Sequence, residues 1–386
     1  TRYIGDWSSD VCSSDLFRTD GTFDYWGFNK DKKFYQDYVC CWSERTSKFL
    51  KQKEPEFSNK IVVTGGVGFD RYVIYKFMQK ETFLLKYNKQ GFKKIVGYAG
   101  WAFGKLDHKR GRDEMLFWAG GDEKKFEWIE TRRKIVRDIL RATIESNPDT
   151  LFILKQHPQE NAPERTTPVT NEMSELSHYN NVVYLCDQEA IHDLISVCDL
   201  WTCFDSTTAL ECWLMGKQTI FINPDPEFTR DELFKGSVLA RSSTEFQMLI
   251  DQFFSSGKIE EFYGSEKDLK RKELIKNIIG FGDGMNHIRA SHYFKKTIEK
   301  SALNTHRFKF IFWHGFVYFL IRMAGPFYNR AIFSKIYKLK KHLWVFENYK
   351  MEKLDALYRK YFPYFEDFYS SKQVEINFLE RFLNNH

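Results

Sequence analysis

Near the middle of the chain stands Phe204-Asp205-Ser206-Thr207-Thr208-Ala209-Leu210-Glu211-Cys212-Trp213-Leu214-Met215-Gly216, with the apolar run Gln218-Thr219-Ile220-Phe221-Ile222-Asn223 close behind it. The pattern predicts the end of a strand, a hydroxyl-rich turn, a helix that stops at Gly216, and a second strand. This strand–helix–strand order indicates an α/β fold with a parallel sheet.

Three consecutive hydroxyl residues, Ser206, Thr207 and Thr208, mark the start of the predicted helix. Free backbone N–H groups, side-chain donors and the positive end of the helix dipole meet at such a point, and together they suit a phosphate group. The alternative is that Ser206 only caps the helix. The turn is therefore a candidate phosphate site at the carboxyl edge of a strand, where ligands bind in this class of fold.

Strands and helices continue to alternate on both sides of this turn. The pattern predicts a Rossmann-like, parallel-sheet domain over residues 61–303, covered by helices on both faces. The predicted strands are 61–63, 93–98, 150–154, 181–186, 199–204, 218–223 and 237–240, and the predicted helices are 127–147 and 189–198 with two more starting near residues 244 and 267.

A second candidate site residue follows the strand 150–154, in the stretch Lys155-Gln156-His157-Pro158. Because parallel strands end at one edge of a sheet, we expect His157 and the Ser206 turn to converge on one crevice. A histidine there could donate a hydrogen bond or a proton to a leaving phosphate. Lys155 would add positive charge unless strand alternation points it elsewhere. Glu211 is a candidate partner for a ribose hydroxyl, or else a solvated helix residue.

Composition narrows the class of protein. The 386 residues are 42% apolar, enough for one large domain or two, and the net charge is +6. Seven cysteines form no Cys-x-x-C pair, so the sequence indicates neither a disulfide framework nor a zinc site and fits a reducing cytoplasm. There is also no Asp-x-Asp and no His/Cys cluster with ligand spacing, so we expect no metal and no cofactor.

The amino-terminal part requires separate treatment. Residues 1–16 (TRYIGDWSSDVCSSDL) back-translate cleanly into a sequence that resembles a short-read sequencing adapter with its index, and we expect them to be an assembly artefact. Residues 17–60 show no clear period and are interpreted as the remnant of a truncated amino-terminal domain. We therefore expect the true amino terminus to lie upstream.

The carboxyl-terminal part, residues 304–386, is predicted to be a helical tail rich in basic and aromatic residues. Between residues 305 and 341 there are eight Lys or Arg, eleven aromatic residues and no Asp or Glu. Its longest apolar run, 310–321, is shorter than the roughly 20 residues of a spanning helix. The composition suits the surface of an anionic membrane, and the alternative is packing against the missing domain. No nucleic-acid motif appears, so we expect no nucleic-acid partner.

The order of these motifs resembles the carboxyl-terminal half of bacterial surface carbohydrate biosynthesis proteins. These are glycosyltransferases of the two-domain GT-B fold. The motifs that carry the resemblance are Lys155-Gln156-His157-Pro158 and the stretch 205–211 before Gly216. More distantly the chain is similar to sialyltransferases, Kdo transferases and CDP-glycerol glycerophosphotransferases. Residues 63–65 with Phe69-Asp70 resemble an element at the domain junction of that group, although Gly66-Val67-Gly68 departs from its pattern.

The resemblance implies a metal-independent glycosyltransferase that takes a CMP- or CDP-linked donor and makes surface polysaccharide or lipid-linked glycan. His157 and Ser206-Thr207 would hold the donor phosphate, and Glu211 would lie near its sugar or ribose. The acceptor would be a glycan or a lipid-linked glycan, at the inner face of the plasma membrane. Because the general base commonly comes from the first domain, we name none and expect the fragment as given to be inactive.

Three alternatives remain at this point. The first is transfer of a polyol phosphate such as glycerol phosphate, which uses the same crevice. The second is a sugar-nucleotide epimerase, which would not explain the basic tail. The third is a non-catalytic, membrane-associated assembly subunit with a degenerate nucleotide site.

Overall fold

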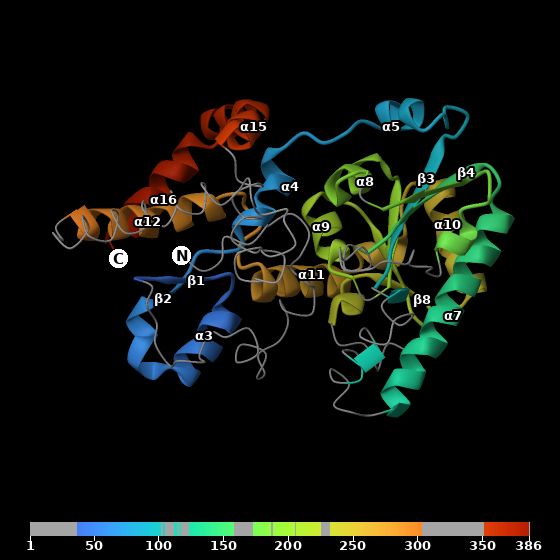
Figure 1. The fold of residues 1–386 in the computed structure, drawn as a ribbon, viewed down its shortest axis with the longest axis horizontal. Coiled ribbons are helices and arrows are strands. Elements are labelled where there is room, and N and C mark those ends of the chain that lie inside the picture. The colour runs from blue at the N-terminus through green and yellow to red at the C-terminus, as the bar shows by residue number, and fades with distance from the viewer. Residues whose placement is uncertain are drawn as a thin grey trace, which may run out of the picture. The chain divides into compact units, whose positions relative to one another are not determined.

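The computed structural model describes residues 37–385 except for 102, 105–111, 114–115, 117–122, 158–172, 187, 205, 225–231 and 303–350 (Figure 1). The described residues form two compact units. One spans residues 39–286, and the other spans 287–385 and includes residues 37–38. The predicted artefact 1–16 and the basic segment 305–341 lie outside the described residues.

A six-stranded sheet forms the centre of the first unit, in the order β5-β4-β3-β6-β7-β8, and every neighbouring pair is parallel. This is the doubly wound arrangement in which the first strand lies in the middle and later strands are added on either side. The expected α/β, Rossmann-like fold is confirmed. The strands are β3 (Lys94–Ala99), β4 (Thr150–Lys155), β5 (Val182–Leu185), β6 (Leu200–Cys203), β7 (Thr219–Ile222) and β8 (Val238–Ala240).

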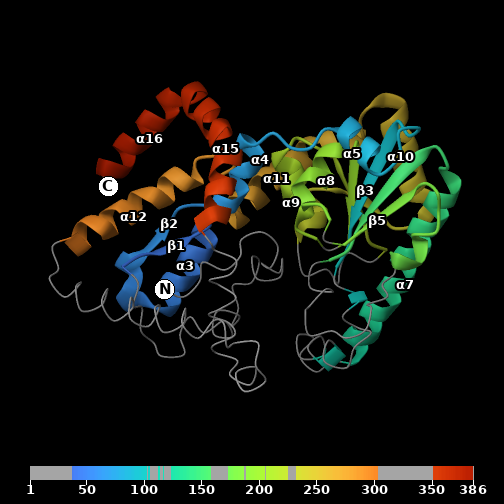
Figure 2. The same ribbon diagram turned by 45° about the horizontal axis from the view of Figure 1, so that its top comes forward.

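Helices cover both faces of this sheet, which explains why its strands are apolar throughout rather than alternating. On one face, α7 (Glu123–Ser146) and α10 (Ser243–Ser256) bury Leu140 and Phe246. On the other, α5 (Lys80–Lys86) and α8 (Ile191–Val197) bury Phe83 and Leu194. Next to α8 lies α9 (Thr208–Leu214), as both ribbon views show (Figures 1 and 2).

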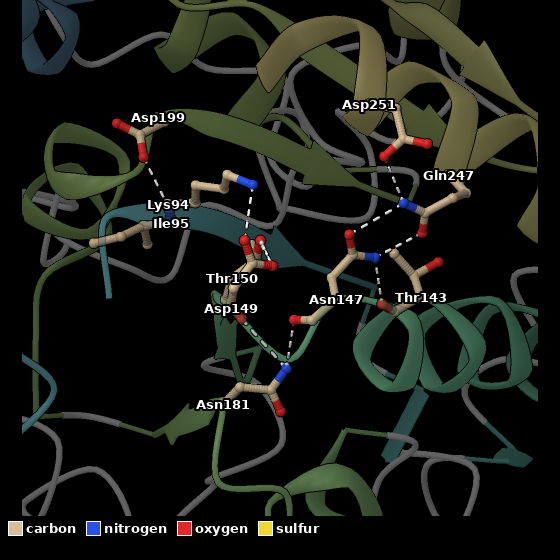
Figure 3. A network of polar contacts seen from close by, with 10 residues as sticks. All are labelled: Lys94, Ile95, Thr143, Asn147, Asp149, Thr150, Asn181, Asp199, Gln247 and Asp251. Atoms are coloured by element: carbon tan, nitrogen blue, oxygen red, sulfur yellow. Dashed lines mark hydrogen bonds and ion pairs between the residues drawn. The ribbon is translucent and has the colours of Figure 1, made fainter. Parts of the chain in front are cut away.

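Hydrogen bonds of polar side chains link the segments at the amino-terminal edge of the sheet (Figure 3). Asn181 donates from Nδ2 to the carbonyl of Asn147 at 2.9 Å, and Asn147 exchanges two hydrogen bonds with Gln247 of α10. Asp199, which directly precedes β6, accepts a hydrogen bond from the backbone N–H of Ile95 on β3 at 2.8 Å. These contacts connect the ends of helices to the starts of strands.

A separate two-stranded parallel sheet precedes the large one. It consists of β1 (Val39–Cys41) and β2 (Ile61–Val63) and packs against α3 (Glu44–Lys53). The predicted strand 61–63 thus exists, but it pairs with residues that showed no pattern in the sequence and does not join the six-stranded sheet. Among the described residues, this unit also contains η1 (Pro55–Lys60), η2 (Val67–Phe69), α4 (Arg71–Ile74), η5 (Ser174–Leu176), η7 (Glu232–Lys235), η8 (Glu260–Tyr263) and α11 (Ser265–Ile278).

The described part of the second unit consists of helices. Its members are α12 (Asn286–Ala302), α15 (Met351–Ser371) and α16 (Gln373–Asn385). His287 of α12 lies 3.0 Å from the hydroxyl of Tyr369 and packs among aromatic rings of α15. Within the described residues, no helix has the length and apolar character needed to cross a bilayer.

Candidate functional site

The carboxyl ends of three central strands are in register. Ala99, the last residue of β3, pairs with Lys155 on β4 and with Cys203 on β6. Neighbouring strands lie about 4.8 Å apart, so the ends of β4 and β6 are separated by about 10 Å. His157 follows β4 by two residues and Ser206 follows β6 by three. The structure therefore brings these two predicted site residues to the same edge of the sheet.

The strand order reverses at β3, because β4 and β5 lie on one side of it and β6, β7 and β8 on the other. In open α/β sheets ligands bind in the crevice at this point of reversal, outside the carboxyl ends of the strands. Gly100 directly follows β3 and Ser206 follows β6 by three residues, so both lie at this edge of the sheet. A Cβ atom on Gly100 would stand only 2.5 Å from the Tyr98 hydroxyl, so this position accommodates no side chain.

At the start of α9, three side chains form a directed chain of hydrogen bonds. Trp201 Nε1 donates to the Thr208 hydroxyl at 3.0 Å, and that hydroxyl donates to Ser206 Oγ at 3.1 Å. The backbone N–H of Thr208 also donates to Ser206 Oγ, at 3.4 Å. The N-cap residue of α9 is Thr207, which makes no side-chain capping hydrogen bond, so the contact with the Thr208 N–H does not make a helix N-cap of Ser206. Because its oxygen is the acceptor in both contacts, its own O–H remains a donor.

The three predicted hydroxyl residues differ in their surroundings. Ser206 and Thr208 are each 8% exposed, whereas Thr207 is half-buried. The Thr208 hydroxyl is engaged by Trp201 and Ser206 inside the fold. Its role in the structure is therefore to orient Ser206.

The end of β4 presents a polar triplet. Lys155 is 7% exposed and lies on the strand face of Leu151 and Ile153, while His157 is half-buried. Between them, Gln156 is 3% exposed, and its Oε1 atom has no hydrogen-bond partner among the described residues. Sequence reasoning assigned no role to Gln156, although a polar residue directly after an apolar strand was the available signal.

Glu211 is half-buried, and its side chain makes a contact within the fold. The hydroxyl of Tyr72, from α4, donates to its Oε2 atom. Burial raises the pKa of Glu211 to about 7, although the hydrogen bond from Tyr72 and the charge of Arg71 act in the opposite direction. Burial and the same carboxylate raise the pKa of Tyr72 well above its usual value. The Tyr72 hydroxyl therefore keeps its proton and is the donor in this hydrogen bond.

Over the part of the chain that the structure describes, no three His, Cys, Asp or Glu side chains lie close enough together to hold a metal ion. The donor set at the carboxyl edge consists instead of hydroxyl, amide, imidazole and ammonium groups. Such groups suit an anionic or hydroxyl-bearing ligand. Metal independence of any reaction stays a prediction.

Residues 127–222 match the family model of capsule polysaccharide biosynthesis proteins. The matched segment runs from α7 to the end of β7 and includes His157, Ser206 and Glu211. The resemblance to surface carbohydrate biosynthesis proteins, expected from the motifs, is thereby confirmed for this segment. No protein with a curated description matches the chain significantly.

Several solved structures are similar to the chain at low identity. A glycosyltransferase from Rickettsia africae is 14% identical, with a TM-score of 0.38, over 71% of this chain and 67% of its own. The wall teichoic acid polymerase TagF is 11% identical, with a TM-score of 0.42, over 69% of this chain and 59% of its own. Anabaena HepE, solved with UDP-glucose, is 13% identical, with a TM-score of 0.36, over 75% and 71%. The chain therefore spans less than two thirds of the polymerase.

Proposed function

We propose that this chain is the donor-binding part of a GT-B-type glycosyltransferase that uses a CMP- or CDP-linked donor to build surface polysaccharide or lipid-linked glycan. The observation that carries the proposal is the hydrogen-bond chain from Trp201 through Thr208 to Ser206. It ends in a hydroxyl donor at the carboxyl edge of the sheet, which His157 shares. The match of residues 127–222 to capsule polysaccharide biosynthesis proteins supports the same activity.

The chemistry of the proposal follows from these donors. A phosphate oxygen accepts the hydrogen of Ser206, which is polarised because Ser206 Oγ itself accepts two hydrogen bonds. His157 donates a hydrogen bond or a proton to the leaving phosphate, and Lys155 contributes positive charge near the strand end. Glu211 accepts hydrogen bonds from ribose hydroxyls. Side chains and backbone dipoles thus neutralise the leaving group without a metal ion.

The membrane part of the proposal is separate. Residues 305–341 carry eight Lys or Arg and no acidic residue, which suits an anionic bilayer surface. We place the protein on the inner face of the plasma membrane, with a glycan or lipid-linked acceptor. Binding of the chain to anionic but not to neutral vesicles, measured by sedimentation, tests this part.

Calorimetric titration of the 386-residue chain with CMP and CDP tests the donor site. We expect Ser206→Ala and His157→Ala each to weaken binding by about tenfold, the scale of one hydrogen bond to a charged group. The matched control is Ser43→Ala, because Ser43 caps α3 by accepting from the Thr46 N–H but lies outside the sheet. The control should lose stability and keep its affinity. Equal affinity in all three variants would refute the donor site.

A further inference from the structure

The segment between β2 and α5 contacts two helices of the large sheet. Tyr72 reaches Glu211 on α9, and the backbone N–H of Met78 donates to Oδ1 of Asp193 on α8 at 2.9 Å. Between them, the rings of Phe77 and His192 lie 5.0 Å apart. A segment that does not belong to the sheet thus supplies a side chain to the helix that follows the Ser206 turn.

Residues 65–70, which precede Tyr72, are held in place by contacts with residues 279–286. Asp70 is 3% exposed and accepts a hydrogen bond from the backbone N–H of Asn286 at 3.2 Å, and the N–H of Gly66 donates to the carbonyl of Ile279 at 2.8 Å. Gly65 has a φ of +82°, and a Cβ there would lie 1.8 Å from the Asn286 side chain. The glycine-containing loop, residues 65–68, therefore fixes the position of α4, which follows it. This is the loop whose sequence departs from the pattern of the domain-junction element.

The carboxylate of Glu211 is held by only one of its two oxygens. Tyr72 donates to Oε2, while Oε1 makes no hydrogen bond with the described residues. A carboxylate accepts through both oxygens, so Oε1 keeps its capacity to accept from a ligand hydroxyl. Tyr72 thereby fixes the rotation of the carboxylate and leaves one edge of it available.

We propose that Tyr72 is a positioning residue, which holds Glu211 in the orientation that a vicinal diol such as the donor ribose requires. This inference rests on the proposed function. Tyr72 and Arg71 of α4 both lower the pKa of Glu211, against burial, which raises it to about 7. Cys212, the neighbour of Glu211 on α9, has a strongly raised pKa because of burial, and it is therefore a neutral thiol. Loss of the Tyr72 hydroxyl leaves the carboxyl protonated over a wider pH range.

Tyr72→Phe tests the proposal, because it keeps the ring packing against Phe69 and Phe77 and removes only the donor. We expect CDP affinity near neutral pH to fall by about tenfold and the pH midpoint of binding to move upward relative to wild type. Glu211→Gln should weaken binding and remove that pH dependence. The matched control is Tyr179→Phe, since Tyr179 donates to Glu145 at the surface, and it should change neither quantity.

The outcomes separate this proposal from the one on which it rests. If Ser206→Ala weakens binding while Tyr72→Phe leaves both affinity and pH midpoint unchanged, the contact is only structural and the inference is overturned, but the proposed function stands. If the wild-type chain binds neither CMP nor CDP, both are overturned. A fall in thermal stability of Tyr72→Phe without a change in binding counts as the first of these results.

Discussion

Tyr72 and Glu211 lie 139 positions apart in the chain, and a hydrogen bond joins the tyrosine hydroxyl to the carboxylate. The hydrogen bond favours the ionised carboxyl group, but burial outweighs it and raises the pKa of Glu211 from 4.5 to about 7. A group that binds its proton more tightly in the folded than in the unfolded chain makes stability depend on pH. The candidate site thus contains a carboxyl group with a measurable folding cost.

The direction in which stability changes with pH follows from the ordinary pKa of a glutamate, 4.5, and the pKa of Glu211 in the folded chain, about 7. Below pH 4.5 the carboxyl group is protonated in both the folded and the unfolded chain, and its contribution to folding stability is fully present. As pH rises through about 7, that contribution to stability is lost. We expect Glu211→Gln to gain stability over wild type as pH rises from about 5 to about 8, by up to about 3 kcal/mol. Urea unfolding at both pH values measures it. An equal difference between Glu211→Gln and wild type at the two pH values would contradict this assignment.

Lys217 closes the carboxyl-terminal end of α8. Its Nζ donates to the carbonyl of Ser196 at 2.7 Å and to that of Cys198. These carbonyls have no partner within the helix, and a cation there also interacts favourably with the helix dipole. Lys217→Met keeps the apolar stem and should lower the free energy of unfolding by about 2 kcal/mol.

A matched variant shows whether the lower free energy of unfolding comes from losing the contacts at the end of α8 or from losing a lysine as such. Lys89 donates to the carbonyl of Asn180 at 2.6 Å on the exposed surface. Lys89→Met should change the unfolding free energy by less than about 0.5 kcal/mol, because exposed polar contacts contribute little. Equal losses in the two variants, measured by urea unfolding, would contradict the assignment to α8.

The sheet was predictable from sequence because its strands are short apolar runs separated by amphipathic helices. The predicted strand 93–98 differs from β3 by one residue at each end, and the predicted strand 150–154 differs from β4 by one residue at its carboxyl end. Shared placement of His157 and Ser206 followed from the geometry of parallel strands alone. Local pattern and a general topological rule were therefore sufficient for the fold and for one edge of the site.

Long-range contacts were not predictable in this way. Nothing in the local pattern around Tyr72 shows that it meets Glu211, because that contact depends on the path of the chain after β2. The pairing of β2 with Val39–Cys41 was missed for a similar reason, since a three-residue strand carries no period. Gln156 was missed because a polar residue directly after an apolar strand is a weak signal, and its unpartnered Oε1 atom becomes evident only from the packing around it.

Asn147 and Gln247 exchange two amide hydrogen bonds between the end of α7 and α10, at 2.6 and 3.1 Å. A double-mutant cycle with Asn147→Ala and Gln247→Ala should give a coupling free energy of about 1 kcal/mol, because each amide loses a partner in the single variants. The exposed contact between Asn277 and Glu273, at 3.5 Å, offers a control cycle with coupling near zero. Additive losses in the first cycle would show that the two amides contribute independently.

Gln156 and Gln218 form a natural comparison of an unsatisfied and a satisfied buried amide. Oε1 of Gln156 has no hydrogen-bond partner among the described residues, whereas Gln218 accepts from Ile259 at 2.6 Å and donates to Gly257 at 3.1 Å. The two side chains are 3% and 6% exposed. They therefore differ in hydrogen bonding far more than in burial.

Methionine has nearly the same shape as glutamine and lacks its hydrogen-bonding groups. Gln156→Met should therefore raise the free energy of unfolding by about 1 kcal/mol, because it removes a buried acceptor that has no donor. Gln218→Met should lower it by about 2 kcal/mol, because two partners lose their contacts. Chemical unfolding of both variants measures the difference. If Gln156→Met were as destabilising as Gln218→Met, Gln156 would have a hydrogen-bonding role that the folded chain alone does not reveal, and nucleotide titration of that variant would be the measurement that locates it.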